Sequence, residues 1–153
     1  SATWRRDGRK LSTRSRYGLR MMFSLATNPD KKPLQLSEIS AREGISEKYL
    51  GQIVIHLRAV GLVTSVRGAQ GGYYLSRDPA EITVLQIVEC LEGDLSIVDC
   101  TVHPEECGRE SVCAAANIWK LLSERVRETL AGITLADMVR IYREKTSALT
   151  FEI

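Results

Sequence analysis

The sequence predicts a mainly α-helical fold with a small β-hairpin wing: a winged helix-turn-helix plus a long dimerisation helix. Residues 36–75 show two short amphipathic helices and then two β-prone segments around a glycine-rich turn, which is the order of elements in a winged helix. Residues 115–130 carry apolar side chains at steps of three and four, the period of a long amphipathic helix.

Basic residues gather in the first half of the chain. Residues 1–77 hold fourteen Lys and Arg against five Asp and Glu, a net charge of +9, whereas residues 78–153 hold seven against fourteen, a net charge of −7. The overall charge of +2 hides this contrast. A basic first half indicates a polyanionic partner, such as double-stranded DNA, for that half only.

Composition narrows the class of protein. A hydrophobic content of 44% in 153 residues suffices for one domain with a sizeable core, or for one domain with an appendage. No apolar run approaches transmembrane length and no secretory signal pattern opens the sequence, so we expect a cytoplasmic protein with no membrane partner. No nucleophile–base pair, paired-carboxylate motif or phosphate-binding loop is evident, so we do not expect an enzyme.

The first element is expected to be a helix over residues 10–27, capped by Ser12 or Thr13. Its apolar stripe consists of Tyr17, Met21, Met22 and Leu25. Arg14 and Arg16 lie off this stripe. The first helix of a winged helix often begins beside the DNA backbone, so these two side chains and the N–H groups of the first turn are candidates for phosphate contacts. A solvated basic face is the alternative.

The helix-turn-helix pattern occupies residues 36–60. Gly44 ends its first helix, and Ser46 is suited to cap the second. The buried side of the second helix is predicted to consist of Leu50, Ile53, Val54 and Leu57. The free side is predicted to consist of Lys48, Gly51, Gln52, Ile55 and Arg58. In a winged helix this second helix commonly enters the DNA major groove.

The wing is predicted from residues 63–67 and 73–75, which are β-prone and flank a tip rich in glycine at residues 68–72. A further helix is expected between Thr83 and Glu92, because Thr83 and Gln86 have the spacing of a capping box. Cys90 lies one position off the apolar stripe of that helix, and we interpret it as a structural thiol.

A long helix with an apolar seam follows, and Gly132 closes it. The seam consists of Ala115, Trp119, Leu122, Val126 and Leu130. The economical partner for this seam is the same helix of a second subunit, which predicts a homodimer; packing onto its own domain is the alternative. Residues 134–142 are expected to form a last short helix, followed by a frayed tail.

These patterns divide the chain into five parts: a flexible leader (1–9), a winged-helix DNA-binding domain (10–92), a cysteine loop (93–113), dimerisation helices (114–143) and a tail (144–153).

Several segments together resemble the Rrf-two (Rrf2) family of bacterial transcriptional regulators, which includes the IscR, NsrR and CymR types. The segments are LSTRSRYGL at 11–19, ISEKYLGQ at 45–52, GLV at 61–63, RGAQGGY at 67–73 and ITLAD at 133–137. The resemblance extends over about residues 10–143. It implies a dimeric winged-helix DNA binder with a long dimerisation helix and a recognition helix at residues 46–60.

The resemblance also implies roles in reading DNA. Lys48 and Gln52 are best placed for base or phosphate contacts, and Arg67 matches the wing Arg that enters the minor groove in this family. IscR-type members often carry Glu just before the Gln, where this chain has Gly51, so their operator sequence is not transferred. The candidate DNA contacts are Arg14, Arg16, Ser46, Lys48, Tyr49, Gln52, Arg58, Arg67 and Gly71.

Three cysteines, Cys100, Cys107 and Cys113, follow the pattern C-x6-C-x5-C before the long helix. Thiolates on one loop can converge on zinc or an iron–sulfur cluster, whereas an odd count in a cytosolic protein disfavours a disulfide framework. The resemblance favours a cluster, because IscR-type and NsrR-type members hold a two-iron or four-iron cluster through three cysteines of this loop. We expect a two-iron rather than a four-iron cluster.

The fourth ligand of such a cluster is left open. IscR-type members supply a His three residues after the last Cys, where this chain has Ala116, and NsrR-type members can use an Asp of the partner's first helix, where this chain has Arg16. The other candidates are His103, Glu105, Glu106 and Asn117.

The predicted function is therefore a DNA-binding transcriptional regulator that senses iron–sulfur, redox or nitrosative status through its cysteine loop. One alternative is a cluster-free family member gated by a partner protein or a small molecule, as the CymR type is. A second alternative, from a different class, is a small metal-dependent enzyme or an electron-transfer module.

Overall fold

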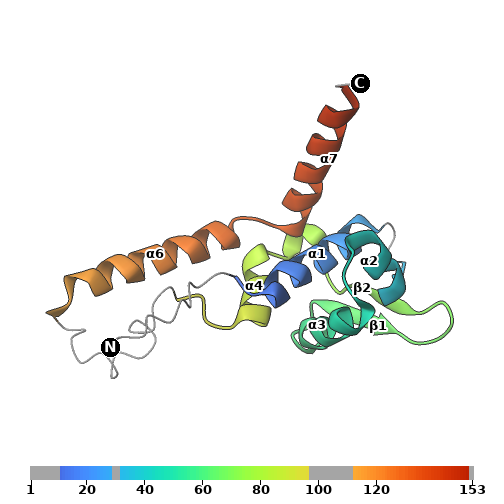
Figure 1. Ribbon diagram of the computed structural model, residues 1–153, viewed down its shortest axis with the longest axis horizontal. Coiled ribbons are helices and arrows are strands. Elements are labelled where there is room, and N and C mark those ends of the chain that lie inside the picture. The colour runs from blue at the N-terminus through green and yellow to red at the C-terminus, as the bar shows by residue number, and fades with distance from the viewer. Residues whose placement is uncertain (1–10, 29–31, 97–111, 152–153) are drawn as a thin grey trace, which may run out of the picture.

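The structure is a computed structural model that describes residues 11–28, 32–96 and 112–151. Its elements in chain order are α1 (Thr13–Thr27), α2 (Leu36–Glu43), α3 (Glu47–Ala59), β1 (Val63–Val66), β2 (Gly72–Leu75), the short 3-10 helix η2 (Pro79–Glu81), α4 (Val84–Glu92), α6 (Ala114–Ala131) and α7 (Leu135–Phe151). Figure 1 shows α1 to α4 and the hairpin gathered together, with α6 and α7 extending away in different directions. The predicted winged-helix fold class is confirmed.

The core lies where α1 meets α3 and α4, because the apolar stripes of these three helices face one another. Six of its most deeply buried members come from these helices and are each at most 1% exposed: Met21 and Met22 of α1, Leu50, Ile53 and Leu57 of α3, and Ile87 of α4. These are residues that the helical spacing assigned to the buried sides. Burying six such side chains supplies a large share of the hydrophobic stabilisation of the domain.

The starts of α1, α3 and α4 and the end of α2 form where the sequence predicts them. Ser12 caps α1, and Gly44 ends α2 with a φ of 66°, a left-handed conformation that glycine adopts without strain. The Ser46 hydroxyl accepts from the Tyr49 N–H at 3.2 Å and so caps α3. Thr83 and Gln86 form the predicted capping box at α4.

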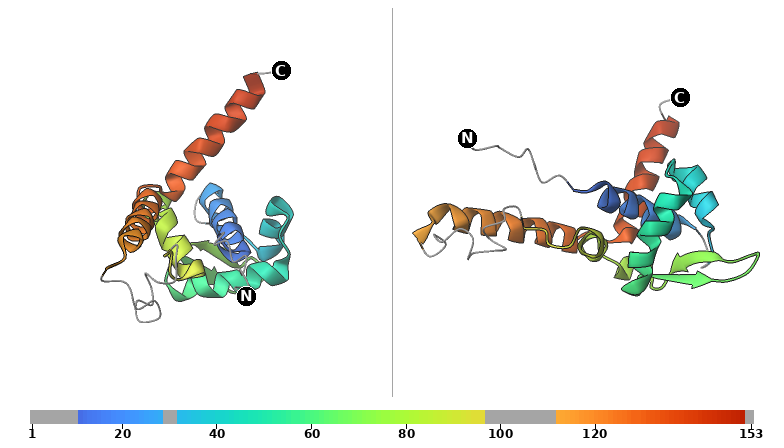
Figure 2. Two further views of the ribbon diagram at one scale, coloured as in Figure 1. Left: turned by 60° about the vertical axis from the view of Figure 1, so that its left-hand side comes forward. Right: turned by 60° about the horizontal axis from the view of Figure 1, so that its bottom comes forward.

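The wing is an antiparallel hairpin in which β1 pairs with β2 from Val63 opposite Leu75 to Val66 opposite Gly72. Figure 2 shows it reaching out beside α3. The segment before α2 braces it: Leu34 and Tyr73 exchange two backbone hydrogen bonds of 2.9 Å. The Gln35 side chain also donates to the Ala69 carbonyl at 3.2 Å.

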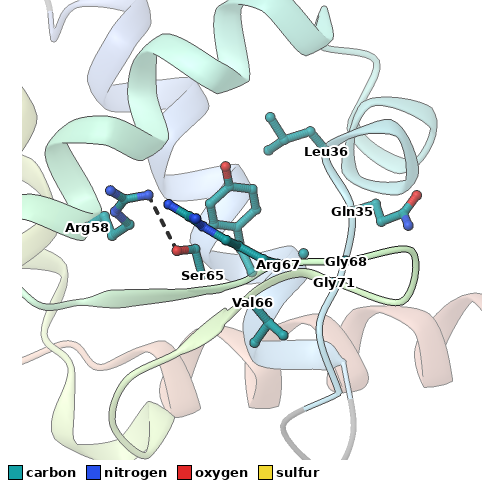
Figure 3. A pocket seen from close by; sticks show the side chains of 10 residues that line it. Gln35, Leu36, Arg58, Ser65, Val66, Arg67, Gly68 and Gly71 are labelled. Carbon is teal, nitrogen blue, oxygen red and sulfur yellow. Dashed lines mark hydrogen bonds between the residues drawn. The ribbon is translucent and has the colours of Figure 1, made fainter.

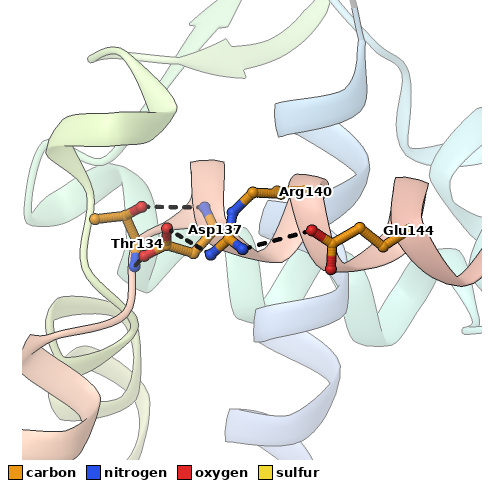
Figure 4. A network of polar contacts seen from close by, with 4 residues as sticks. All are labelled: Thr134, Asp137, Arg140 and Glu144. Carbon is orange, nitrogen blue, oxygen red and sulfur yellow. Dashed lines mark hydrogen bonds and ion pairs between the residues drawn. The ribbon is translucent and has the colours of Figure 1, made fainter.

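The helix α7 is longer than predicted and partly belongs to the core. The expectation of a short helix with a frayed tail is wrong, because α7 continues to Phe151, in a stretch that contains neither Gly nor Pro. Its start is fixed by Thr134 and Asp137, which bond each other's backbone N–H groups, and by Arg140, which pairs with Asp137 and Glu144 (Figure 4). Leu135 is fully buried in the winged-helix core.

The helix α6 contacts its own domain along a narrow side. Arg127 forms an ion pair with Glu89 of α4, with 2.5 Å between Nη1 and Oε1, and Ser123 is buried. Much of the predicted seam is exposed in the single chain: Trp119 is 38% and Leu122 is 44% exposed. Within the described residues, none of the helices has the length and apolar content needed to span a bilayer.

Candidate nucleic-acid interface

The recognition helix α3 presents one exposed stripe. Lys48, Gln52 and Ile55 follow one another at steps of four and three and are exposed, because the opposite side of the helix is buried in the core. The stripe combines a positive charge, an amide and an apolar side chain, the groups that bind phosphates, purine edges and thymine methyl groups respectively. Ser46, a further predicted contact, is exposed at the start of this helix but uses its hydroxyl as the cap.

The start of α1 lies along one side of this stripe. Arg14 lines a hollow of about 350 Å³ with Gln52, Ile55 and His56 of α3. The fold thus brings a predicted phosphate-binding Arg beside the predicted base-reading face. Arg16 is exposed, donates to the Thr13 hydroxyl at 3.3 Å and does not line this hollow.

Tyr49 has a packing role. Its ring is half-buried and meets the Tyr17 ring edge-on, with 5.8 Å between the ring centres. The Arg20 guanidinium lies 5.5 Å from the Tyr17 ring and also forms an ion pair with Glu43 at 3.1 Å. This chain of contacts fixes the angle between α1 and the helix-turn-helix.

The wing lies along the other side of the stripe. A second hollow of about 350 Å³ opens between the end of α3, the hairpin and the start of α2. Figure 3 shows Arg58, Ser65 and Arg67 along one side of it, with Gln35 and Leu36 across from them. Arg58 donates to the Ser65 hydroxyl at 3.4 Å. The fold therefore brings two predicted DNA-contacting arginines, Arg58 and Arg67, to one hollow.

Gly71, another predicted contact, shapes the wing through its backbone. Its N–H donates to the Gly68 carbonyl at 3.0 Å, which closes the turn at the tip. A Cβ atom at Gly71 would lie 2.1 Å from the Val66 carbonyl oxygen, so no other residue fits this turn without moving the backbone. Gly71 therefore sets the position in which Arg67 is presented.

A carboxylate that the sequence did not single out joins α4 to the start of α1. Glu92 Oε2 accepts from the Ser12 N–H at 3.0 Å, from the Ser12 hydroxyl at 2.7 Å and from the Ser15 hydroxyl. Burial raises the pKa of Glu92, but the bonds from Ser12 and Ser15 and the charge of Arg14 outweigh it, so the pKa lies below that of an ordinary glutamate. The carboxylate is therefore ionised at neutral pH. Glu92 lies 77 residues from Ser15 and 80 residues from Ser12 in the chain, so no local sequence pattern predicts these bonds.

The cysteine residues fall into two groups. Cys90 is half-buried beside the core, where burial raises the pKa of its thiol, and it donates to the His56 carbonyl at 3.4 Å; these contacts agree with a structural thiol. Of the predicted metal ligands, Cys100 and Cys107 lie outside the described residues, as do the candidate fourth ligands His103, Glu105 and Glu106. Cys113 directly precedes α6 and is a free, half-exposed thiol.

Elsewhere in the described part of the chain, no three His, Cys, Asp or Glu side chains are grouped as a metal ion would require. Cys113 is a free thiol, and its side chain makes no capping bond to α6. The three thiols of the sequence are the kind of ligands that bind a soft metal or an iron–sulfur cluster.

A helix-turn-helix with an exposed recognition stripe, flanked by Arg14 on one side and an arginine-bearing wing on the other, defines a winged-helix DNA-binding protein. A sequence model of the Rrf2 family, described as an iron-dependent transcriptional regulator, matches residues 11–141. The chain belongs to the Rrf2 family of transcriptional regulators.

Individual relatives agree with this assignment. Protein rrf2 of Nitratidesulfovibrio vulgaris is 38% identical over 131 residues, which cover 86% of this chain and 87% of that protein. The transcriptional regulator CymR of Bacillus subtilis is 38% identical over 144 residues, which cover 94% of this chain and 99% of CymR. Among solved structures, T. potens IscR superposes with a TM-score of 0.74 at 39% identity, covering 90% of this chain and 91% of that one. The related proteins are transcriptional regulators rather than enzymes, as the sequence predicted.

Proposed function

We propose that this regulator acts in the cytoplasm and binds a partly palindromic operator as a homodimer, with α3 in the major groove and Arg67 of the wing in the minor groove. The observation that carries the proposal is the arrangement around α3. The exposed stripe of Lys48, Gln52 and Ile55 is flanked by two hollows that hold Arg14 on one side and Arg58 with Arg67 on the other. A duplex laid on the stripe would meet cations along both edges.

The proposed dimer rests on α6. Four large apolar side chains of this helix, Ile118, Trp119, Leu121 and Leu122, are each more than a third exposed in the single chain. An apolar surface of this kind marks an interaction site, and a second copy of the same helix is the partner that symmetry supplies most simply. Two copies would also provide the two recognition helices that a palindromic operator requires.

The proposed cofactor is an iron–sulfur cluster, a two-iron cluster in preference to a four-iron one, held by Cys100, Cys107 and Cys113 with an unidentified fourth ligand. Such a cluster would supply a group whose state responds to iron supply, oxidants or nitrosative stress. Cys113 immediately precedes α6, so an interaction that holds its thiol also orders the first turn of the proposed dimerisation helix. A change there would alter the spacing or tilt of the two recognition helices.

Replacement of Arg67 by Ala is expected to weaken operator binding by about tenfold, because a wing cation leaves the interface. Its effect should be measured by fluorescence anisotropy on a duplex that the wild-type protein selects from a random-sequence library, across a series of salt concentrations. Wild-type affinity should fall steeply as salt rises, and the slope should be shallower in the variant. Arg143→Ala, an exposed Arg of α7, is the matched control and should behave as wild type. Equal affinities for Arg67→Ala and wild type would remove Arg67 from the contacts.

Protein purified without oxygen is expected to contain iron and acid-labile sulfide and to absorb visible light. Cys113→Ser should lose that absorption, because a serine hydroxyl is a poor ligand for a soft iron–sulfur cluster. Cys90→Ser is the matched control, since Cys90 packs beside the core outside the loop, and it should keep the wild-type spectrum. Iron and sulfide would be measured chemically beside the spectrum. Wild-type protein without either would rule out the cluster.

Wild-type protein that contains neither iron nor sulfide would favour the alternative function, a cluster-free regulator gated by a partner protein or a small molecule. The observation behind this alternative is the similarity to CymR, described as the global cysteine regulator of B. subtilis, whose structure superposes with a TM-score of 0.72 and is covered to 97% by this chain. Under this alternative, DNA binding and dimerisation stay as proposed and only the signal differs.

A further inference from the structure

The hydrogen bonds of Glu92 link two parts of the molecule that the proposed function treats separately. Glu92 is the last residue of α4, and Gly93, with a φ of 85°, ends the helix at the first residue of the cysteine loop. The Glu92 carboxylate collects three donors from the first turn of α1: the Ser12 N–H, the Ser12 hydroxyl and the Ser15 hydroxyl. Ser15 is only 1% exposed, whereas Glu92 and Ser12 are half-buried, so the link is partly shielded from water.

The turn of α1 that Glu92 holds is the turn that carries Arg14. Arg14 lies between Ser12 and Ser15 in the chain, is itself exposed, and reaches the hollow beside Gln52 and Ile55 of the recognition helix. Ser12 also accepts from the Ser15 N–H at 3.2 Å. With both serines bonded to one carboxylate, the first turn of α1 cannot rotate or unwind without breaking several charge-assisted hydrogen bonds.

We infer that Glu92 is a positioning residue for DNA binding: it fixes the first turn of α1 so that Arg14 meets a phosphate beside the recognition helix. This inference rests on the proposed function, in which Arg14 contacts DNA. Because Glu92 is also the last residue of α4, its carboxylate ties the start of α1 to the end of α4.

Two other roles for Glu92 make different predictions. If it only caps the start of α1, its loss lowers stability and leaves the DNA affinity of the folded protein unchanged. If its negative charge acts directly on the nearby phosphates, its loss strengthens DNA binding, and loss of a Ser15 bond has no effect.

The test compares four single variants and one double variant on a duplex selected by the wild-type protein from a random-sequence library. Glu92→Ala removes the carboxylate, Ser15→Ala removes one of its buried donors without changing charge, and Arg14→Ala removes the proposed phosphate contact. Glu81→Ala, an exposed glutamate of η2, is the matched control for loss of one negative charge. Affinity is measured as a function of salt, and circular dichroism with thermal unfolding checks that each variant is folded.

Glu92→Ala and Arg14→Ala are each expected to weaken binding roughly three- to tenfold and to lower the salt slope by about one for each subunit bound. Ser15→Ala should produce part of this effect, and Glu81→Ala none. The decisive result is the double variant: in the Arg14→Ala background, Glu92→Ala should cause no further loss of affinity, because the contact that it positions is already gone.

Equal losses from Glu92→Ala in both backgrounds would overturn the inference, as would unchanged affinity with a lowered melting temperature, or tighter binding. An Arg14→Ala variant that binds like wild type would also overturn it, while leaving the rest of the proposed interface standing. If Glu92→Ala does not fold, Ser15→Ala and its combination with Arg14→Ala provide the same comparison. Failure of the wild-type protein to select any duplex would overturn the proposed function itself, and the inference with it.

Discussion

Replacement of Gly72 by Ala is expected to weaken specific DNA binding at least tenfold while the helical core stays folded. Gly72 has a φ of 147°, and a Cβ atom there would lie 2.6 Å from the Leu34 carbonyl oxygen and 2.7 Å from its carbon. The next residue, Tyr73, makes both backbone bonds to Leu34 that brace the hairpin. A methyl group must therefore push the wing away from the segment before α2, at a strain cost of about 1–3 kcal/mol.

The wing would then present Arg67 in the wrong place, and we expect at least a tenfold loss of operator affinity. Anisotropy on the selected duplex measures the loss, and far-ultraviolet circular dichroism monitors the helices. Gly68→Ala is the matched control, because Gly68 also has a positive φ, of 109°, but a Cβ there would meet open space. It should lose less affinity. Wild-type binding by Gly72→Ala would mean that the brace to Leu34 does not govern the wing.

Replacement of Leu122 by Lys is expected to convert the dimer to a folded monomer that binds operator poorly. Leu122 is 44% exposed on the side of α6 that its own domain leaves uncovered. Full burial of an exposed Leu contributes about 1.5–3 kcal/mol. Since only 44% of Leu122 is left to bury, and a symmetric interface loses that contribution twice, the loss is roughly 1.3–2.6 kcal/mol. That corresponds to a dissociation constant raised by about tenfold or more, before the cost of burying a charge is added.

Light scattering coupled to size-exclusion chromatography would measure the mass of the protein across a dilution series. Glu124→Lys introduces the same side chain two residues further along α6, on the opposite side of the helix, and should remain dimeric. The melting temperature extrapolated to low concentration should be equal in both variants, because neither position belongs to the core. A dimeric Leu122→Lys variant would place the subunit interface elsewhere.

The sequence was sufficient to predict most of the winged helix, because each of its signals is local. Periodic side chains such as Leu50, Ile53 and Leu57 identify a helix and its buried side, and Gly44 and Ser46 mark where the chain turns. These choices depend on neighbours a few residues away, which the sequence displays directly. The same reasoning was wrong for the last helix. Residues 143–150 bury no apolar stripe, so only the absence of helix breakers indicated that α7 continues.

The candidate interface was predictable in its residue types but not in its geometry. Exposed cations at Arg14, Arg58 and Arg67 were expected from position in a winged helix and from the family resemblance. These three arginines line two hollows on opposite sides of one stripe, because α1 and the hairpin pack against α3. That packing depends on contacts between distant segments of the chain. Ser65 at the wing and Gln35 before α2 have no recognisable motif and join the site only through this packing.

By itself, the sequence determined the order of the elements, the buried sides of the helices in the winged helix, the basic character of the first half and the three thiols of the cysteine loop. Only the tertiary structure decided that Glu92 bonds Ser12 and Ser15, that Leu135 of α7 completes the core, and that the outer side of α6 stays uncovered. The physical reason is how far apart in the chain the interacting residues lie. Helix propensity and capping act between residues that are close in the chain. The hydrogen-bond donors of a carboxylate and the neighbours of an apolar side chain are instead set when distant segments pack together.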